Sequence, residues 1–321
     1  MSDEQTSEST SILIGISACL LGEKVRFDTG HKHSSYITGT LGQFFTFRPF
    51  CPEMAIGLGT PRETLRLVDL NGEIHCVGTK TEGHNVTQRL IQSADEQREW
   101  LKDLCGYIFK KDSPSCGMER VKVYKGNMPE KSGVGIYAQR VMASFPNLPI
   151  EEEGRLGDPV LRENFVKRVF AYREWRDLVQ AGLTQHSLTR FHSRFKYVLL
   201  AHEEARTREL GAWLAQQSGE VTELTRNHYL STFMGILQQR ATRKRHVNVL
   251  QHLQGFLKDE IDAQDKQELV EIIEQYRSEK LPLIVPVTLL RHHFRRHPKP
   301  FVENSAYLQP HPSELMLLNS I

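Results

Sequence analysis

The chain has 321 residues, of which 39% are hydrophobic and 25% are charged, as in an ordinary globular protein. No apolar run approaches the roughly 20 residues that span a bilayer, and the polar start lacks the features of a signal peptide. These features argue against a membrane-spanning or secreted protein. We therefore expect a cytoplasmic protein in which residues 1–10 form a disordered tail, and the length allows two domains.

Strands and helices alternate in the first half of the sequence. Short apolar runs and helical spacing predict strands at 12–17 and 44–50, a hairpin over 65–77, one helix over 86–109, a strand at 121–124, a helix start at 133–136 and a last strand from 148. This order is typical of an α/β module with a mostly parallel sheet and flanking helices, which we place at residues 11–157.

Three cysteines stand in loops where apolar runs end. Cys19 follows the first predicted strand, Cys51 follows the second, and Cys116 lies in a loop that Pro114 and Gly117 keep non-helical. Because parallel strands build sites at their carboxyl ends, we expect these loops to form one composite site.

The spacing of these cysteines decides between kinds of metal site. No pair has the C-x-x-C spacing of a zinc knuckle, and five cysteines without a secretion signal argue against disulfides. Three thiolates from separate loops suit an iron–sulfur cubane in which one iron has no protein ligand. Three unrelated cysteines remain the alternative. Cys76 and Cys105 lack a loop context and are predicted to be packing residues.

The second half has helical periodicity almost throughout. Asp158 is a plausible N-cap before Pro159, and the pattern predicts an all-α domain over 158–321. The predicted helices cover 165–179, 187–217, 221–237, 247–261, 267–276 and a segment after Pro286, and we expect the tail from residue 298 to pack across them.

Charge is concentrated in this second half, although the formal net charge is only +2. Residues 165–300 contain 22 Lys and Arg against 15 Asp and Glu, with nine of the 14 histidines. Such a surplus indicates a surface that meets a polyanion, but a solvated basic helical surface explains it equally well.

Five motifs in the first half occur in the order of a known family. They are Ser-Ala-Cys19-Leu-Leu-Gly, Val-Arg26-Phe-Asp28, Cys51-Pro-Glu53, Gly57-Leu-Gly-Thr-Pro-Arg62 and Asp-Ser113-Pro-Ser-Cys116-Gly. Over residues 12–155 the chain resembles the thiouracil desulfidase family, with Phe27 and Thr29 where that family often has Tyr and Gly. The resemblance implies a 4Fe–4S cluster held by Cys19, Cys51 and Cys116, with one open iron site for the substrate sulfur, and a non-redox hydrolysis that releases sulfide.

The matching positions also imply roles for polar residues. Glu53 is the candidate general acid and base, and Ser113 the candidate for positioning water or the ring. Glu53 could instead only orient its loop, and Ser113 could cap the turn, a role that suits Ser115 better. The candidate substrate-binding residues are Arg26, Asp28, Arg62 and Ser115. The alternative for Arg26, Asp28 and Arg62 is that they tie loops together by salt bridges.

The helical half resembles a YbgA-like domain found alone or fused to the desulfidase module. Its marks include Arg194-Phe-Lys196, Ala201-His202, Ala241-Thr-Arg243-Lys-Arg-His246 and Pro310-His-Pro-Ser-Glu314. The fusion resembles tRNA 4-thiouridine desulfidases, which implies that 4-thiouridine-containing tRNA is the substrate. The expected RNA contacts are Arg194, Lys196, Arg243, Lys244, Arg245 and His246.

Two other functions remain open from the sequence. The first is a desulfidase of free thiopyrimidines or thiouridine nucleotides. The second is a non-enzymatic iron–sulfur sensor that binds nucleic acid. No membrane and no obligate protein partner are expected for any of the three.

Overall fold

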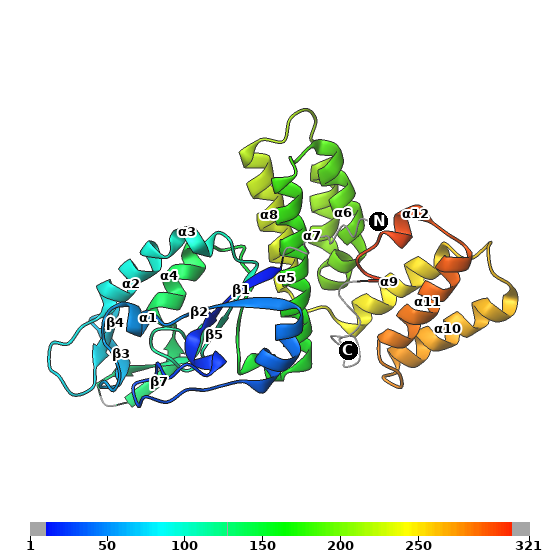
Figure 1. Cartoon of the computed structure of the whole chain (residues 1–321). Coiled ribbons are helices and arrows are strands. Elements are labelled where there is room, and N and C mark those ends of the chain that lie inside the picture. The colour runs from blue at the N-terminus through cyan, green and yellow to red at the C-terminus, as the bar shows by residue number, and fades with distance from the viewer. Residues whose placement is uncertain (1–10, 127, 310–321) are drawn as a thin grey trace, which may run out of the picture. The chain divides into compact units, whose positions relative to one another are not determined.

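The structure is a computed structural model that describes residues 11–126 and 128–309 (Figure 1). Contacts divide the chain into two compact units, with the boundary between Gly157 and Asp158. The N-terminal tail and the motif that begins at Pro310 lie outside the described residues. In the part of the chain that the structure describes, no helix has both the length and the apolar character needed to cross a membrane.

The first unit is built on a four-stranded parallel sheet with the strand order β2-β1-β5-β8. Its strands are β1 (Ile12–Ser17), β2 (Phe45–Phe50), β5 (Gly106–Phe109) and β8 (Ile150–Glu152), and every neighbouring pair is parallel. Ile14 and Ile16 on β1 have no exposed surface, which is what the apolar run at 12–17 requires. The α/β module predicted from the sequence is confirmed.

A second, mixed sheet completes the first unit, with the order β4-β3-β6-β7. It contains β3 (Leu65–Leu70), β4 (Glu73–Gly78), β6 (Val121–Lys125) and β7 (Met128–Gly133). Strands β3 and β4 form the predicted hairpin, with Asn71 and Gly72 at positive φ in its turn. Strand β7 was not predicted because it is an exposed edge strand that contains Pro129 and has no alternating apolar pattern.

The single helix predicted over residues 86–109 is wrong. Helix α2 (Thr87–Glu96) and the short α3 (Arg98–Leu101) are followed by a turn, and residues 106–109 form the central strand β5. All four residues of β5 are buried between β1 and β8. A short apolar run fits a buried strand and a helix face equally well, so periodicity could not separate the two.

Shorter helices connect these strands in the first unit. They are η1 (Ala18–Leu21), η2 (Tyr36–Thr40), η3 (Leu41–Gln43), α1 (Pro52–Ala55), α4 (Ile136–Ser144) and η4 (Arg155–Gly157).

The second unit is all-α in its described residues, as predicted. Its helices are α5 (Pro159–Gln180), α6 (Gln185–His202), α7 (Glu204–Ala215), α8 (Glu223–Gln238), α9 (Arg243–Gly255), α10 (Ala263–Arg277), α11 (Ile284–Arg296) and α12 (Pro300–Glu303). Asp158 caps α5 by accepting hydrogen bonds from the N–H groups of Val160 and Leu161. The helix predicted over 187–217 is two helices, because Glu203 between them has an extended backbone.

The described part of the C-terminal segment packs on this helical core. Ala306, Tyr307 and Leu308 are buried, and the N–H of Ala306 donates to the carbonyl of Arg194 on α6. This agrees with the predicted packing of the tail up to residue 309.

Candidate functional site

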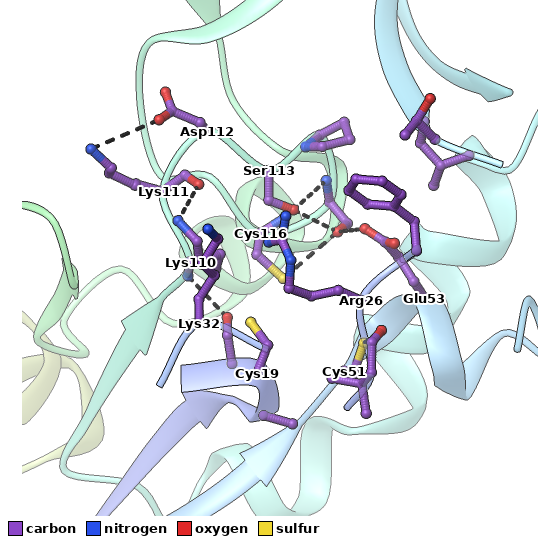
Figure 2. Close-up of a pocket in the computed structure, with 18 of the residues that line it drawn as sticks. Cys19, Arg26, Lys32, Cys51, Glu53, Lys110, Lys111, Asp112, Ser113 and Cys116 are labelled. Carbon is purple, nitrogen blue, oxygen red and sulfur yellow. Dashed lines mark hydrogen bonds and ion pairs between the residues drawn. The ribbon is translucent and has the colours of Figure 1, made fainter. Parts of the chain in front are cut away.

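A cavity of about 450 Å³ lies where the parallel sheet ends in its cysteine-bearing loops (Figure 2). That volume falls in the range of small-molecule sites, roughly 300–1,000 Å³. The lining combines three thiols, several cations, four hydroxyls and two aromatic rings; it includes Cys19, Cys51, Cys116, Arg26, Phe27, Lys32, Glu53, Arg62, Lys110, Ser113 and Ser115.

The three predicted cysteines meet at this cavity. Cys19 lies in η1 directly after β1, Cys51 is the N-cap of α1 directly after β2, and Cys116 lies in the loop after β5. All three thiols are free, and Figure 2 shows their sulfur atoms around a common space. Among the described residues, no three His, Cys, Asp or Glu side chains lie close enough to hold a metal ion. Thiols spread around a space fit a cluster, because each then binds a different iron.

Burial raises the pKa of all three thiols and so disfavours their thiolate form. It raises the pKa of Cys19 to about 11, with a smaller contribution from neighbouring Cys51. Burial also raises the pKa of Cys51 and, more strongly, that of Cys116. Three thiolates at this position therefore need a compensating cation, and an all-sulfur donor set favours soft iron–sulfur or similar centres over hard cations.

The loop that carries Cys116 is held by its own hydrogen bonds and by helix α4. The Ser113 hydroxyl accepts from the N–H groups of Ser115 (3.3 Å) and Cys116 (3.1 Å). From the next segment, Gly135 N–H donates to Gly117 O at 2.7 Å and Ala138 N–H donates to Ser115 O at 3.1 Å. These two hydrogen bonds from the start of α4 hold the Cys116 loop in position.

Gly135→Ala is expected to destabilise the first unit by about 1–3 kcal/mol, because a Cβ there has no space. It would lie 2.6 Å from the backbone carbon and 2.7 Å from the oxygen of Ser115. Gly39→Ala is the matched control, since a Cβ at that position meets nothing within 4 Å. Urea unfolding of both variants measures the difference, and equal midpoints would show that the loop does not rest on Gly135.

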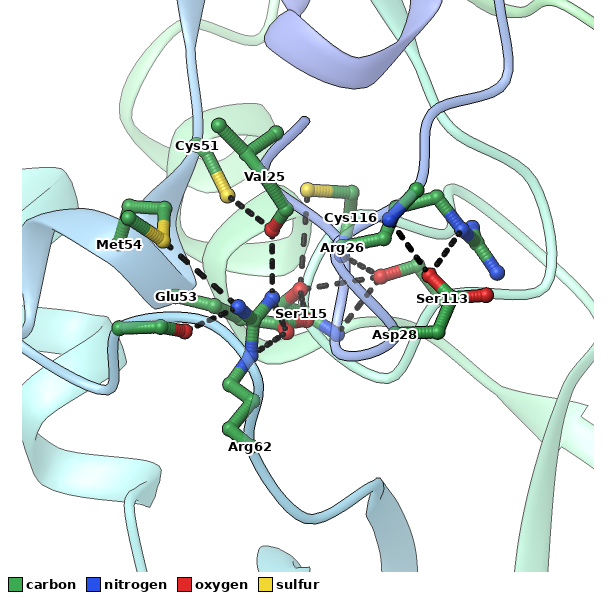
Figure 3. Close-up of polar contacts among 12 residues, drawn as sticks. Val25, Arg26, Asp28, Cys51, Glu53, Met54, Arg62, Ser113, Ser115 and Cys116 are labelled. Atoms are coloured by element: carbon green, nitrogen blue, oxygen red, sulfur yellow. Dashed lines mark hydrogen bonds and ion pairs between the residues drawn. The ribbon is translucent and has the colours of Figure 1, made fainter. Parts of the chain in front are cut away.

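Two residues that line the same cavity, Arg62 and Ser115, hold the carboxylate of Glu53 (Figure 3). Its Oε2 accepts from Arg62 Nε at 3.0 Å and Arg62 Nη2 at 2.6 Å, and its Oε1 accepts from the Ser115 hydroxyl at 2.6 Å. Arg62 also donates to the carbonyls of Val25 (2.9 Å) and Gly59 (2.6 Å), and its side chain is only 6% exposed. Arg62 therefore orients the carboxylate and ties three loops, which is the second of its two predicted roles.

The hydrogen bonds of the two serines differ from the sequence expectation that Ser115 caps the turn. Ser115 gives its one hydroxyl proton to Glu53, so the 3.0 Å contact between the hydroxyls requires Ser113 to donate to Ser115. Ser113 also accepts two backbone N–H groups, which makes it the residue that caps the turn. The resulting chain of hydrogen bonds runs from Ser113 through Ser115 to Glu53.

The other predicted substrate contacts divide into two groups. Arg26 lines the cavity and lies 3.7 Å from Asp28, whose carboxylate also accepts the N–H of Gly30 at 3.0 Å. Asp28 shapes that turn and does not line the cavity. Phe27, the position where the family often has Tyr, lines the cavity and is 37% exposed. The sequence reasoning missed the lining residue Lys32.

Lys110 is a further missed residue of the cavity. It follows β5 directly and forms an ion pair with Glu153 at 2.5 Å. The sequence placed it at the start of the Cys116 loop but gave it no role, and the end of strand β5 brings it to the sheet edge. By contrast, the prediction that Cys76 and Cys105 are packing residues is confirmed, since they are 0% and 1% exposed and lie outside the cavity.

Four of the six expected RNA contacts bind other parts of the helical unit. Arg194 pairs with Glu174, and Arg245 donates to the carbonyl of His202. Arg243 lies over the Tyr276 ring, 4.5 Å from its centroid. The fourth is His246, which is 1% exposed and whose Nδ1 lies 2.9 Å from the Tyr307 hydroxyl. The other two expected contacts, Lys196 and Lys244, are exposed.

Comparisons with known proteins match each part of the chain. Residues 14–153 match the family model described as 2-thiouracil desulfurase, and residues 196–312 match DUF1722, a protein family of unknown function. The uncharacterised protein YbgA of Escherichia coli is 31% identical over 154 residues, which are 48% of this chain and 91% of YbgA. The uncharacterised protein YbbK of Bacillus subtilis is 26% identical over 152 residues, 46% of this chain and 99% of YbbK.

One solved structure is also similar in sequence. It is the [4Fe-4S]-dependent thiouracil desulfidase TudS, which is 28% identical and matches over 45% of this chain and 93% of its own, with a TM-score of 0.36.

Proposed function

The chain belongs to the 2-thiouracil desulfurase family over residues 14–153, joined to a DUF1722 domain, and we propose that it hydrolyses the carbon–sulfur bond of a thiopyrimidine at the three-cysteine cavity. The observation that carries this proposal is the meeting of three free thiols and one oriented carboxylate around a single cavity. The family match makes the first unit a desulfidase and leaves the non-enzymatic sensor without support.

We place a 4Fe–4S cluster on Cys19, Cys51 and Cys116, whose separate loops and all-sulfur donor set fit it. When bound, such a cluster supplies one iron without a protein ligand, which is a Lewis acid suited to a soft sulfur atom. No other described cysteine reaches the cavity, so the chain offers no fourth thiolate there.

Glu53 is the group that moves protons in this proposal. Its Oε1 accepts one proton from the water that attacks the thiocarbonyl carbon and later gives this proton to the departing sulfur. The second proton of hydrogen sulfide comes from the carbon-bound hydroxyl when the new carbonyl forms. One water and one thiopyrimidine thus give one pyrimidine and one hydrogen sulfide, without a net redox change. Arg62 and Ser115 hold the carboxylate in a fixed direction, so their role is positioning.

The substrate ring has suitable partners in the same cavity. Phe27 presents an aromatic face, and Arg26 and Lys32 present cations for a carbonyl oxygen or a phosphate. The family description concerns 2-thiouracil, so it favours a free thiopyrimidine over 4-thiouridine in tRNA. The internal bonding of Arg194, Arg243, Arg245 and His246 points the same way. tRNA stays as the second candidate because a groove lined by Arg66, Lys122 and Lys131 adjoins the cavity.

The proposal is tested with anaerobically iron-reconstituted protein and 2-thiouracil, 4-thiouracil or 4-thiouridine. We expect the near-ultraviolet thiocarbonyl absorbance to fall while sulfide appears in equal amount. Persistence of the absorbance with all three substrates, with the cluster shown to be present, would remove desulfidation from the account.

A further inference from the structure

A largely buried ion pair, Lys110 with Glu153, adjoins the cysteine cavity. Lys110 Nζ and Glu153 Oε1 are 2.5 Å apart, and the two side chains are only 12% and 14% exposed. Figure 2 shows Lys110 and Glu53 on opposite sides of the Cys19 and Cys116 sulfur atoms. Lys110 lines the cavity and Glu153 does not, so the pair presents its positive end to the thiols. The function proposed above gives this pair no role.

The ends of three neighbouring strands hold the ion pair in place. Lys110 follows β5, and its N–H donates to the hydroxyl of Ser17, the last residue of β1, at 3.0 Å. Glu153 follows β8, and its N–H donates to the carbonyl of Phe109 at 3.1 Å. The second oxygen of the Glu153 carboxylate accepts the N–H of Lys111 at 2.7 Å. The edge of the parallel sheet thus fixes where the ammonium group lies.

The charge of Lys110 acts on one of the three thiols. Burial and the neighbouring Cys51 raise the pKa of Cys19, and Lys110 is the strongest of the influences that lower it. Glu153 acts on the same thiol in the opposite direction and more weakly. The ammonium group therefore stabilises negative charge at Cys19 by more than its partner carboxylate destabilises it.

Three other cations of the lining are less suited to act on the thiols. Arg62 forms its ion pair with Glu53, which lines the cavity too, so the two charges offset each other there. Lys32 and Lys111 are exposed to water, which screens their charge. Lys110 is largely buried and its partner carboxylate lies outside the lining, so its charge acts on the cavity with less screening.

We propose that Lys110, held by Glu153, is a positioning residue that sets the charge around the iron–sulfur cluster. The inference rests on the proposed function, because it takes the cluster to be bound by Cys19, Cys51 and Cys116. Three thiolates in one buried cavity repel one another, and an ammonium group beside them offsets part of that repulsion. Net charge is one of the factors that set the reduction potential of a cluster, and a nearby cation raises that potential. The same cation stabilises negative charge that develops on the departing sulfur.

The test replaces each end of the ion pair in the reconstituted holoprotein. Lys110→Met removes the positive charge and keeps most of the length of the side chain, whereas Glu153→Gln removes the negative charge and can still accept hydrogen bonds. The matched controls are Lys102→Met and Glu99→Gln, which break an exposed ion pair of 2.7 Å outside the cavity. A dye-mediated redox titration, followed by visible absorption, measures the midpoint potential of the cluster in each variant.

The two ends of the pair should shift the midpoint potential in opposite directions. Lys110→Met is expected to make it more negative, because the reduced cluster loses a stabilising cation. Glu153→Gln is expected to make it more positive, because the ammonium charge is no longer offset. A purely structural role would move both in the same direction or neither. Lys110→Met should also lower kcat by about 10- to 100-fold, whereas Lys110→Arg and both controls should stay close to the natural potential.

Each possible result decides the inference. Unchanged potentials, or shifts in the same direction, with full iron content overturn it even where every form releases sulfide. Opposite shifts without sulfide release by any form support the charge effect and reject the proposed hydrolysis. A natural chain that binds no cluster overturns both. If Lys110→Met alone loses its iron, the comparison of Glu153→Gln with Glu99→Gln decides: a more positive potential supports the inference and an equal one overturns it.

Discussion

Replacing Cys116 by Ser is expected to abolish both the iron–sulfur absorption of the reconstituted protein and its desulfidase activity. Cys116 is 6% exposed and its sulfur lies 3.7 Å from the Ser115 hydroxyl, in a loop fixed by Ser113 and by the start of α4. A serine occupies nearly the same space, but its hydroxyl is a harder ligand than a thiolate and deprotonates far less readily. Two remaining thiols would leave a second iron without a protein ligand.

The matched control for this variant is Cys105→Ala. Cys105 is equally buried, at 1% exposed, but lies outside the cavity, so its loss should cost packing and leave the iron content unchanged. Iron and acid-labile sulfide per chain, together with the visible absorption spectrum, measure both variants. Full iron content in Cys116→Ser would contradict the assignment of the three ligands.

Glu53→Gln is expected to lower kcat by about 10²- to 10⁴-fold while the cluster is retained. Glutamine has the size of glutamate and can still accept from Arg62 or Ser115, but it cannot take up a proton from water. The loss should therefore appear in kcat rather than in KM, with unchanged iron content and an unchanged visible spectrum.

Glu63→Gln serves as the control for Glu53→Gln. The Glu63 carboxylate lies on the same stretch of chain, accepts from the N–H groups of Lys80 and Thr81, and does not line the cavity. It should retain nearly full turnover. A Glu53→Gln variant with the kcat of the natural chain would remove Glu53 from the proton transfers and leave it only the role of orienting its loop.

The sequence was sufficient to predict the features that depend on local pattern. The β-branched residues of the run at 12–17 favour a buried strand, and the cysteines after it and after residues 45–50 lie where parallel strands end. The pair Asp158-Pro159 was enough to predict where α5 starts, because Asp158 is its N-cap and Pro159 its first residue.

What the sequence could not predict depends on tertiary contacts. Residues 106–109 form a strand because they pair with β1 on one side and β8 on the other. The local sequence of these four residues does not reveal that pairing. Ser113 and Ser115 differ by two positions in one turn, and only the approach of Glu53 from another loop decides which hydroxyl it receives.

The basic residues show the same limit for charge. A count of Lys and Arg suggested that the helical half meets a polyanion, yet Arg194, Arg243 and Arg245 donate to groups within that unit. Arg66 lies far from Lys122 and Lys131 in the sequence, and the three attract no notice there. Strand register alone brings them into one row.

The most direct test of the hydrolysis is anaerobic turnover of 4-thiouracil in water enriched in the heavy isotope of oxygen. Glu53 and the three-thiol cavity predict one sulfide released for each uracil formed, with the heavy oxygen in the uracil detected by mass spectrometry. Uracil without the heavy label, or substrate consumed without an equal amount of sulfide, would contradict a hydrolytic desulfidation at this site.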